Sequence, residues 1–133
     1  MKNKTKFELI TPTQTVINQD IEMVVVPGSE GHFGVLPLHA NTLSTLNRGI
    51  VKIYENSIPK DEIIIDGGIV DVTPHGCSIL VERAEKIDNL NKTEIEKKYK
   101  FHKNKESGFE NPIEEKANDD EIKWLKFVLE QIK

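Results

Sequence analysis

Val24-Val-Val-Pro-Gly-Ser-Glu-Gly-His-Phe-Gly-Val-Leu-Pro-Leu-His-Ala40 is the most strongly specified stretch of the chain. Its first residues continue an apolar run that begins at Met23 and is typical of a strand buried on both faces. Pro27 has no amide hydrogen and is expected to end that strand. Glycines at positions 28, 31 and 34 would allow the backbone to take positive φ angles repeatedly. The pattern predicts a shaped surface loop whose role is a contact rather than a reaction.

Short apolar and β-branched runs continue on both sides of this stretch, from Phe7 to about residue 86. Turn residues separate these runs, and we expect turns at Asn47-Arg48-Gly49, at a break over Asp66-Gly67-Gly68, and at 73–76. Strands with turn signals about every 8–12 residues are typical of an antiparallel sandwich or barrel. The sequence therefore predicts an N-terminal antiparallel β-sandwich over residues 1–86.

The composition changes over residues 87–133, which are rich in lysine and glutamate and contain no β-branched run. Asn91 with Glu94 is typical of a helix start, and residues 107–112 predict the end of that helix. A second helix is expected to begin near Asp119 and to carry an apolar stripe, with Trp124 beside it. The stripe consists of Ile122, Leu125, Leu129 and Ile132. The predicted fold class is thus mainly β plus α, with a C-terminal two-helix hairpin that needs packing to be stable.

Composition excludes several classes of function. The 133-residue chain has a formal net charge of −4, which argues against a nucleic-acid-binding protein. Cys77 is its one cysteine, so no disulfide framework and no cysteine-based zinc site is expected. We see no signal sequence at the N-terminus and no apolar run near the ~20 residues that a membrane helix needs.

No catalytic constellation is expected. The glycines at 28, 31 and 34 do not match a phosphate-binding loop, because no Gly-Lys-Ser/Thr follows. His32 and His39, seven residues apart, match no metal-ligand spacing, and we interpret them as solvent-facing or interface side chains. Asp66 and Asp71 are expected to bond local backbone rather than to act as an acid–base pair. Cys77 is predicted to be an inert core residue, and no cofactor is expected.

Four segments together form a composite motif: segment 25–40, the Arg48-Gly49 turn, Asp66-Gly67-Gly68-Ile69-Val70-Asp71-Val72 and Leu80-Val81-Glu82-Arg83-Ala84-Glu85. In these segments the chain resembles the ε subunit of rotary F-type ATP synthases. The resemblance covers the whole β region, and the order of a β-sandwich followed by a helical hairpin is similar too. The long composite motif is specific.

The resemblance implies a non-catalytic subunit of the central stalk. In that family the sandwich sits at the foot of the γ subunit, on the loops of the membrane c-ring, and couples proton flow to ATP synthesis. The contact with the c-ring and γ would be made by Glu30, Gly31, His32, Phe33, Gly34 and His39, with His39 toward γ.

The same resemblance implies where the subunit works. It would be peripheral and would touch the membrane only through the complex. The lack of a transit-peptide pattern favours the cytoplasmic face of a bacterial inner membrane, and an organellar counterpart stays open. Its hairpin would contact the α and β subunits transiently.

The hairpin departs from the family pattern at two points. Many bacterial members use basic residues of the second helix to inhibit ATP hydrolysis, whereas here that helix has Lys123, Lys126 and Lys133 but no arginine. Some members bind ATP through Ile-Asp-x-x-Arg-Ala, whereas this chain has Asp88 but lacks the Arg-Ala. Weak or absent ATP binding is expected, and inhibition stays open.

Two other classes of function stay open on the residues alone. One is an unrelated β-sandwich adaptor whose hairpin binds a different partner. The other is a small hydrolase or metal enzyme that uses His32 and His39. Copurification with a γ subunit would separate the first from the stalk subunit, and a bound metal would favour the second.

Overall fold

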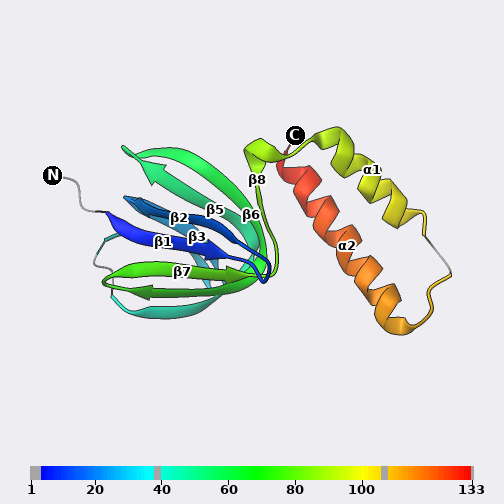
Figure 1. The fold of residues 1–133 in the computed structure, drawn as a ribbon, viewed down its shortest axis with the longest axis horizontal. Coiled ribbons are helices and arrows are strands. Elements are labelled where there is room, and N and C mark those ends of the chain that lie inside the picture. Colours follow the sequence, from blue (N-terminus) through cyan, green and yellow to red (C-terminus); the bar gives the residue numbers. More distant parts are fainter. Residues whose placement is uncertain (1–3, 38–39, 106–107, 133) are drawn as a thin grey trace. The chain divides into compact units, whose positions relative to one another are not determined.

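The computed structural model describes residues 4–37, 40–105 and 108–132. The chain divides into two compact units, Met1–Asp88 and Asn89–Lys133. The first unit is built of strands and the second of helices (Figure 1). The predicted fold class, a β-sandwich followed by a two-helix hairpin, is confirmed.

The first unit is one continuous hydrogen-bonded sheet. Its main path runs in the order β2-β1-β7-β6-β5-β3-β4, and β8 pairs with β6 beside that path. The strands are β1 (Thr5–Ile10), β2 (Thr15–Ile21), β3 (Met23–Gly28), β4 (Gly31–Val35), β5 (Thr42–Glu55), β6 (Ile58–Thr73), β7 (Gly76–Val81) and β8 (Ala84–Lys86). A short 3₁₀ turn, Ile87–Asn89, follows β8.

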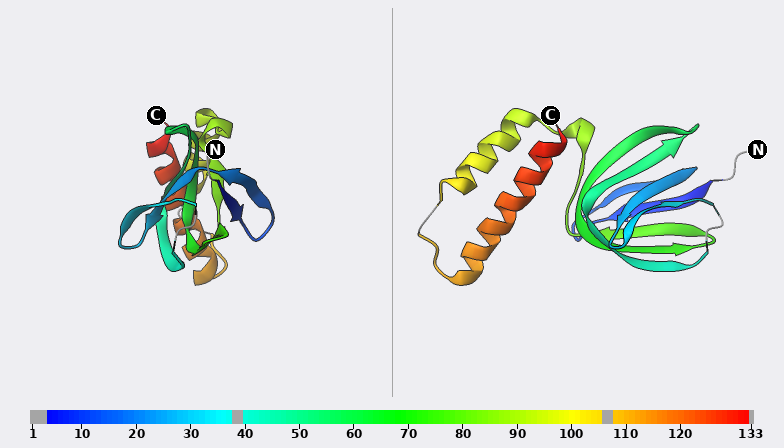
Figure 2. Two further views of the ribbon diagram at one scale, coloured as in Figure 1. Left: turned by 90° about the vertical axis from the view of Figure 1, so that its left-hand side faces the viewer. Right: turned by 180° about the vertical axis from the view of Figure 1, so that it is seen from behind.

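The two longest strands, β5 and β6, belong to both layers of the sandwich. The N-terminal part of β5 and the C-terminal part of β6 lie in the layer of β1, β2 and β7. Their other halves lie in the layer of β3, β4 and β8. Figure 2 shows the curvature of these strands in two further views. The buried core of this unit includes Phe7, Leu9, Val24, Ile53 and Ile79, each 0% exposed.

Two of the predicted turns are wrong. Asn47-Arg48-Gly49 lies inside β5, and Asp66-Gly67-Gly68 lies inside β6. Glycine at these places bends a continuous strand instead of reversing the chain: Gly67 and Gly68 have φ angles of +73° and +151°. The bends are the corners at which β5 and β6 pass from one layer to the other.

The second unit is a hairpin of two antiparallel helices, α1 (Lys92–Lys103) and α2 (Pro112–Gln131) (Figure 1). The Asn91 side chain accepts a hydrogen bond from the amide of Glu94 at 3.2 Å, so the predicted start of the first helix is confirmed. The amide of Glu114 donates to Asn111 at 2.8 Å, which makes Asn111 the N-cap of α2.

The prediction that the second helix begins near Asp119 is wrong. Asn111 followed by proline is a start signal, and the helix begins there. The three acidic residues from Asp119 therefore lie inside the helix and not at its N-terminus. The buried face of α2 is also rotated from the predicted stripe: Trp124 and Val128 are buried, whereas Ile122 and Leu129 are half-buried.

Candidate partner-binding surfaces

The glycine-rich stretch forms the β3–β4 hairpin. In this hairpin Val26 pairs with Phe33, Pro27 with His32, and Gly28 with Gly31, so β3 does not end at Pro27 as predicted. Pro27 is tolerated within the strand because the pairing of β3 with β5 shifts register between Val25 and Gly28. The expected surface loop is therefore a two-stranded projection with a short turn at Ser29 and Glu30.

The turn of this hairpin is fixed by close contacts. The Ser29 amide donates to the Thr45 carbonyl at 3.0 Å, which ties the turn to β5. A Cβ atom added at Gly28 would lie 2.8 Å from Cε1 of Phe33, so the glycine leaves room for that ring. Gly31 has a φ of +125°. Gly28 and Gly34 have no positive φ angle. The prediction that all three glycines take positive φ angles is therefore wrong for two of them.

The predicted contact residues differ in exposure. Glu30, Gly31, His32 and Gly34 are exposed. Phe33 is half-buried and packs against the core. His39 lies outside the described residues. The structure thus brings Glu30 to Gly34 together at one hairpin tip, with a carboxylate and an imidazole presented to solvent and an aromatic ring anchoring them from below.

A second surface was not predicted from the sequence. Ile10, Leu80 and Ile69 lie side by side on β1, β7 and β6, because Ile10 pairs with Leu80 and Leu80 pairs with Ile69. We call these three residues the outer apolar row. Leu80 is 51% exposed and Ile69 46% exposed, so the row faces away from the core. Thr45 on β5 pairs with Ile69. Leu43, two residues before Thr45 on the same face of β5, is 74% exposed and extends the apolar surface.

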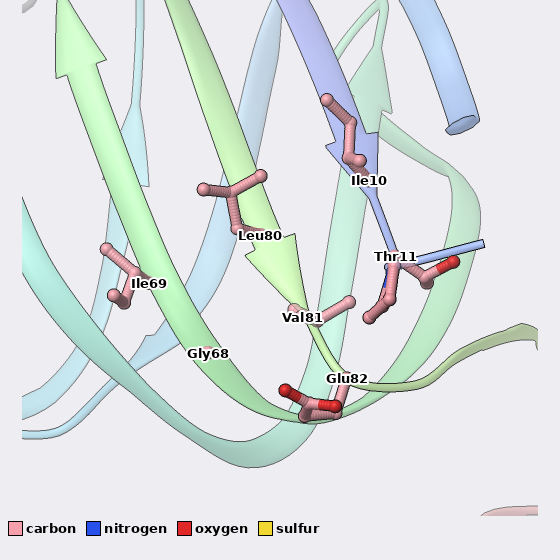
Figure 3. Close-up of a pocket in the computed structure, with 8 residues that line it drawn as sticks. Ile10, Thr11, Gly68, Ile69, Leu80, Val81 and Glu82 are labelled. Atoms are coloured by element: carbon pink, nitrogen blue, oxygen red, sulfur yellow. The ribbon is translucent and has the colours of Figure 1, made fainter. Parts of the chain in front are cut away.

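A hollow of about 400 Å³ lies over the outer apolar row. It is lined by the row together with Thr11, Pro12, Gly68, Val81 and Glu82. Figure 3 shows Ile69 and Leu80 on neighbouring strands, with Glu82 at the end of β7. An exposed apolar strip with a hollow and a carboxylate beside it is suited to an apolar side chain of a protein partner. The sequence offered no signal for this surface, because Ile69 and Leu80 lie in apolar runs in which each residue resembles core.

The alternative chemistries are not assembled in the part of the chain that the structure describes. Within those residues, no group of three or more His, Cys, Asp and Glu side chains could hold a metal ion. Asp66 is not paired with Asp71 but receives the Nε–H of Arg48 at 2.7 Å. Cys77 is buried, as predicted. Among the described helices, none is long and apolar enough to cross a membrane.

The fold and these two surfaces define the chain as a β-sandwich protein suited to contacts with other proteins. A family model described as "ATP synthase, Delta/Epsilon chain, beta-sandwich domain" matches residues 4–87. The ATP synthase epsilon chain of Granulibacter bethesdensis is 33% identical over 95 residues, which is 71% of this chain and 70% of that protein. The epsilon chain of Rhizobium rhizogenes is 35% identical with the same coverage. The chain therefore belongs to the ATP synthase epsilon chain family, and the family resemblance of the sequence is confirmed.

Solved structures share the fold over the hairpin as well. A chain of the Euglena gracilis mitochondrial ATP synthase, in a structure of its OSCP/F1/c-ring part, superposes with a TM-score of 0.73 at 16% identity, covering 98% of this chain and 82% of that one. A chain of the Tetrahymena thermophila mitochondrial ATP synthase, in a structure of its central stalk and c-ring, gives 0.61 at 17% identity, covering 99% and 98%. At these identities the match concerns the fold alone.

Proposed function

We propose that this chain is a non-catalytic central-stalk subunit that couples rotation of the membrane c-ring to ATP synthesis in the catalytic head. The observation that carries the proposal is the pair of exposed surfaces on one sandwich, the β3–β4 hairpin tip and the outer apolar row. A subunit that couples two partners needs a separate contact surface for each of them. Membership of the epsilon chain family supports the same role.

The β3–β4 hairpin tip is the proposed contact with the c-ring. Glu30 and His32 supply exposed polar groups, and Gly31 keeps the turn narrow. Phe33 and Gly34 complete the tip. Because the Ser29 amide is held by β5, the tip is braced against sideways displacement.

The outer apolar row is the proposed contact with the γ subunit. Its exposed leucine and isoleucine side chains would be covered in the complex, and burying about 25 cal/mol per Å² of apolar surface would stabilise the association. Glu82 beside the row favours a basic residue on the partner. His39 is also proposed to lie toward the γ subunit.

The helical hairpin is proposed to contact the α and β subunits transiently. Lys123 and Lys126 are exposed on α2 and are available for acidic partners. We place the subunit at the cytoplasmic face of a bacterial inner membrane, peripheral, with no membrane contact except through the complex.

The experiment is ATP hydrolysis by a reconstituted α, β and γ complex, with the full chain and with a truncation after Lys86. We expect both forms to bind the complex. If the full chain inhibits and the truncation does not, the hairpin is a brake. If neither inhibits, the chain is a structural coupler. If neither form binds, the proposed function is wrong.

A variant separates the outer apolar row from the rest of the sandwich. Leu80→Asp places a carboxylate in the row and is expected to weaken binding to γ at least tenfold, because a charge would be desolvated there. Ile58→Asp is the matched control, since Ile58 is 64% exposed in the β5–β6 turn region, away from the row in the sheet register. Equal binding by both variants would contradict the assignment of the row to γ.

A further inference from the structure

One polar residue interrupts the buried face of the second helix. Asn118 is 8% exposed and is buried on α2 together with Trp124, Leu125 and Val128. A buried amide without hydrogen-bond partners would destabilise the fold. The groups that bind the Asn118 amide therefore indicate its structural role.

Both ends of the Asn118 amide are bound by the same residue of the first helix. Its Nδ2 donates to the backbone carbonyl of His102 at 3.1 Å, and its Oδ1 lies 2.8 Å from Nδ1 of His102. A carbonyl oxygen only accepts, so the amide nitrogen must face it, and Oδ1 must then face the ring. Nδ1 of the ring therefore carries a hydrogen and donates it to Oδ1.

The first of these bonds also completes the end of α1. His102 lies in the last turn of α1, where carbonyl groups have no partner in the next turn. The His102 carbonyl also accepts the Lys105 amide, at 3.3 Å, so Asn118 adds a partner from the other helix. Asn118 therefore acts as a cap that one helix supplies to the other.

Apolar contact does little to fix how the two helices meet. Ile95 is the buried apolar residue of α1 and Tyr99 is half-buried, whereas Phe101 is 66% exposed. With so few apolar side chains on α1, packing alone sets the register of the two helices weakly. A single buried polar pair is known to fix register between packed helices.

We propose that the His102–Asn118 pair is a latch that holds the hairpin closed in one register, and that loss of the pair lets α1 and α2 separate while each stays helical. The inference concerns the hairpin alone and stands independently of the proposed place in the stalk.

The test measures the distance between the helices in the full chain by double electron–electron resonance. Spin labels are attached at Lys97→Cys on α1 and Lys126→Cys on α2, both exposed positions, in a Cys77→Ala background. The labelled chain that retains His102 and Asn118 should give a single narrow distance distribution. Asn118→Leu, which keeps the branched shape and removes both hydrogen bonds, should raise the separated population by about tenfold.

Two variants of His102 distinguish a hydrogen bond from packing. His102→Asn places an amide N–H near the position of Nδ1 and should keep the narrow distribution, whereas His102→Leu should broaden it. Lys98→Ala, at an exposed position of α1, is the control and should leave the distribution unchanged. Far-UV circular dichroism should show unchanged helix content in every variant.

Three outcomes would overturn the latch. A narrow distribution in Asn118→Leu would mean that apolar contacts hold the hairpin by themselves. Equal broadening by His102→Asn and His102→Leu would mean that the ring acts by its shape. Loss of helix content together with broadening would mean that the pair is needed for folding of the helices rather than for their closure.

Discussion

Arg48 and Asp66 face each other across β5 and β6, with Nε of the arginine 2.7 Å from Oδ1 of the aspartate. They are paired directly in the sheet register, at the corners where both strands change layer. Their side chains are 32% and 24% exposed, so the pair is partly shielded from water. The amide of Asp66 also donates to the Arg83 carbonyl at 3.1 Å, which connects this corner to the chain entering β8.

Removing this ion pair should destabilise the sandwich. Asp66→Asn keeps the shape of the side chain but removes its charge, and we expect the free energy of unfolding to fall by about 1 kcal/mol, the value for a partly exposed charged hydrogen bond. Urea denaturation followed by circular dichroism measures it. Lys60→Ala, which breaks a more exposed pair with Glu55, is the control and should cost less than about 0.5 kcal/mol. Equal losses of unfolding free energy in the two variants would mean that the Arg48–Asp66 pair stabilises the sandwich no more than an exposed ion pair does.

Among the glycines that the structure describes, Gly68 is the least able to accept a side chain. Its φ is +151°, and an added Cβ atom would lie 2.2 Å from the Leu80 carbonyl oxygen. Gly68→Ala must therefore displace β7 from β6, and we expect a loss of roughly 3 kcal/mol or more in unfolding free energy.

Gly34→Ala is the matched control for Gly68→Ala. An added Cβ atom at Gly34 would meet its nearest neighbour, Sδ of Met23, at an ordinary 3.5 Å. We expect a change within about 1 kcal/mol, the ordinary cost or gain of such a substitution. Thermal melting of both variants checks the difference. Equal stability of the Gly68→Ala and Gly34→Ala proteins would show that β6 and β7 accommodate the added methyl group at little cost.

The architecture could be predicted from the sequence because apolar periodicity and turn residues recur throughout residues 5–86. The corners could not. The same glycines mark a chain reversal or a bend in a continuous strand, and only the pairing of Leu46 with Gly68 and of Arg48 with Asp66 distinguishes the two. Likewise, the sequence around Asn111 holds both a stop for one helix and a start for the next, and the prediction recognised only the stop.

The candidate site was predictable to a similar extent. The tip from Glu30 to Gly34 could be chosen from glycine spacing and from the family resemblance. The outer apolar row could not, because Ile69 and Leu80 sit in apolar runs in which each residue resembles core. Whether a strand face is buried depends on which layer packs against it, and a local sequence pattern does not show that a face is uncovered.

ATP is expected to bind the hairpin weakly or not at all. The two arginines of the chain, Arg48 and Arg83, both precede the hairpin, so it offers no planar guanidinium for bidentate phosphate contacts. Asp88, which is retained from the family pattern, lies in a short 3₁₀ turn and is exposed. Millimolar ATP should leave the melting temperature of the full chain and of Asp88→Ala equally unchanged. A micromolar binding isotherm for the unmodified chain would contradict this expectation.

The Cys77 thiol should be unreactive while the protein is folded. Burial, assisted by the negative charge of Asp71, raises the pKa of Cys77 from 9.0 to about 12. Only the thiolate is nucleophilic, so at pH 8 alkylation by iodoacetamide should be on the order of a thousandfold slower in the native chain than in the urea-unfolded chain. Comparable rates in the two states would mean that the thiol is accessible and ionised.

The same raised pKa predicts how stability depends on pH. Below pH 9 both the folded and the unfolded chain keep the thiol proton, and the stabilising effect of the buried neutral thiol is fully present. Between 9.0 and about 12 the unfolded chain loses this proton and the folded chain keeps it. The unfolding free energy should then fall by about 1.4 kcal/mol per pH unit relative to Cys77→Ala, which has no such group. Urea denaturation of both proteins at pH 8, 9.5 and 10.5 measures this difference, and parallel pH profiles would show that the thiol is not protected by burial.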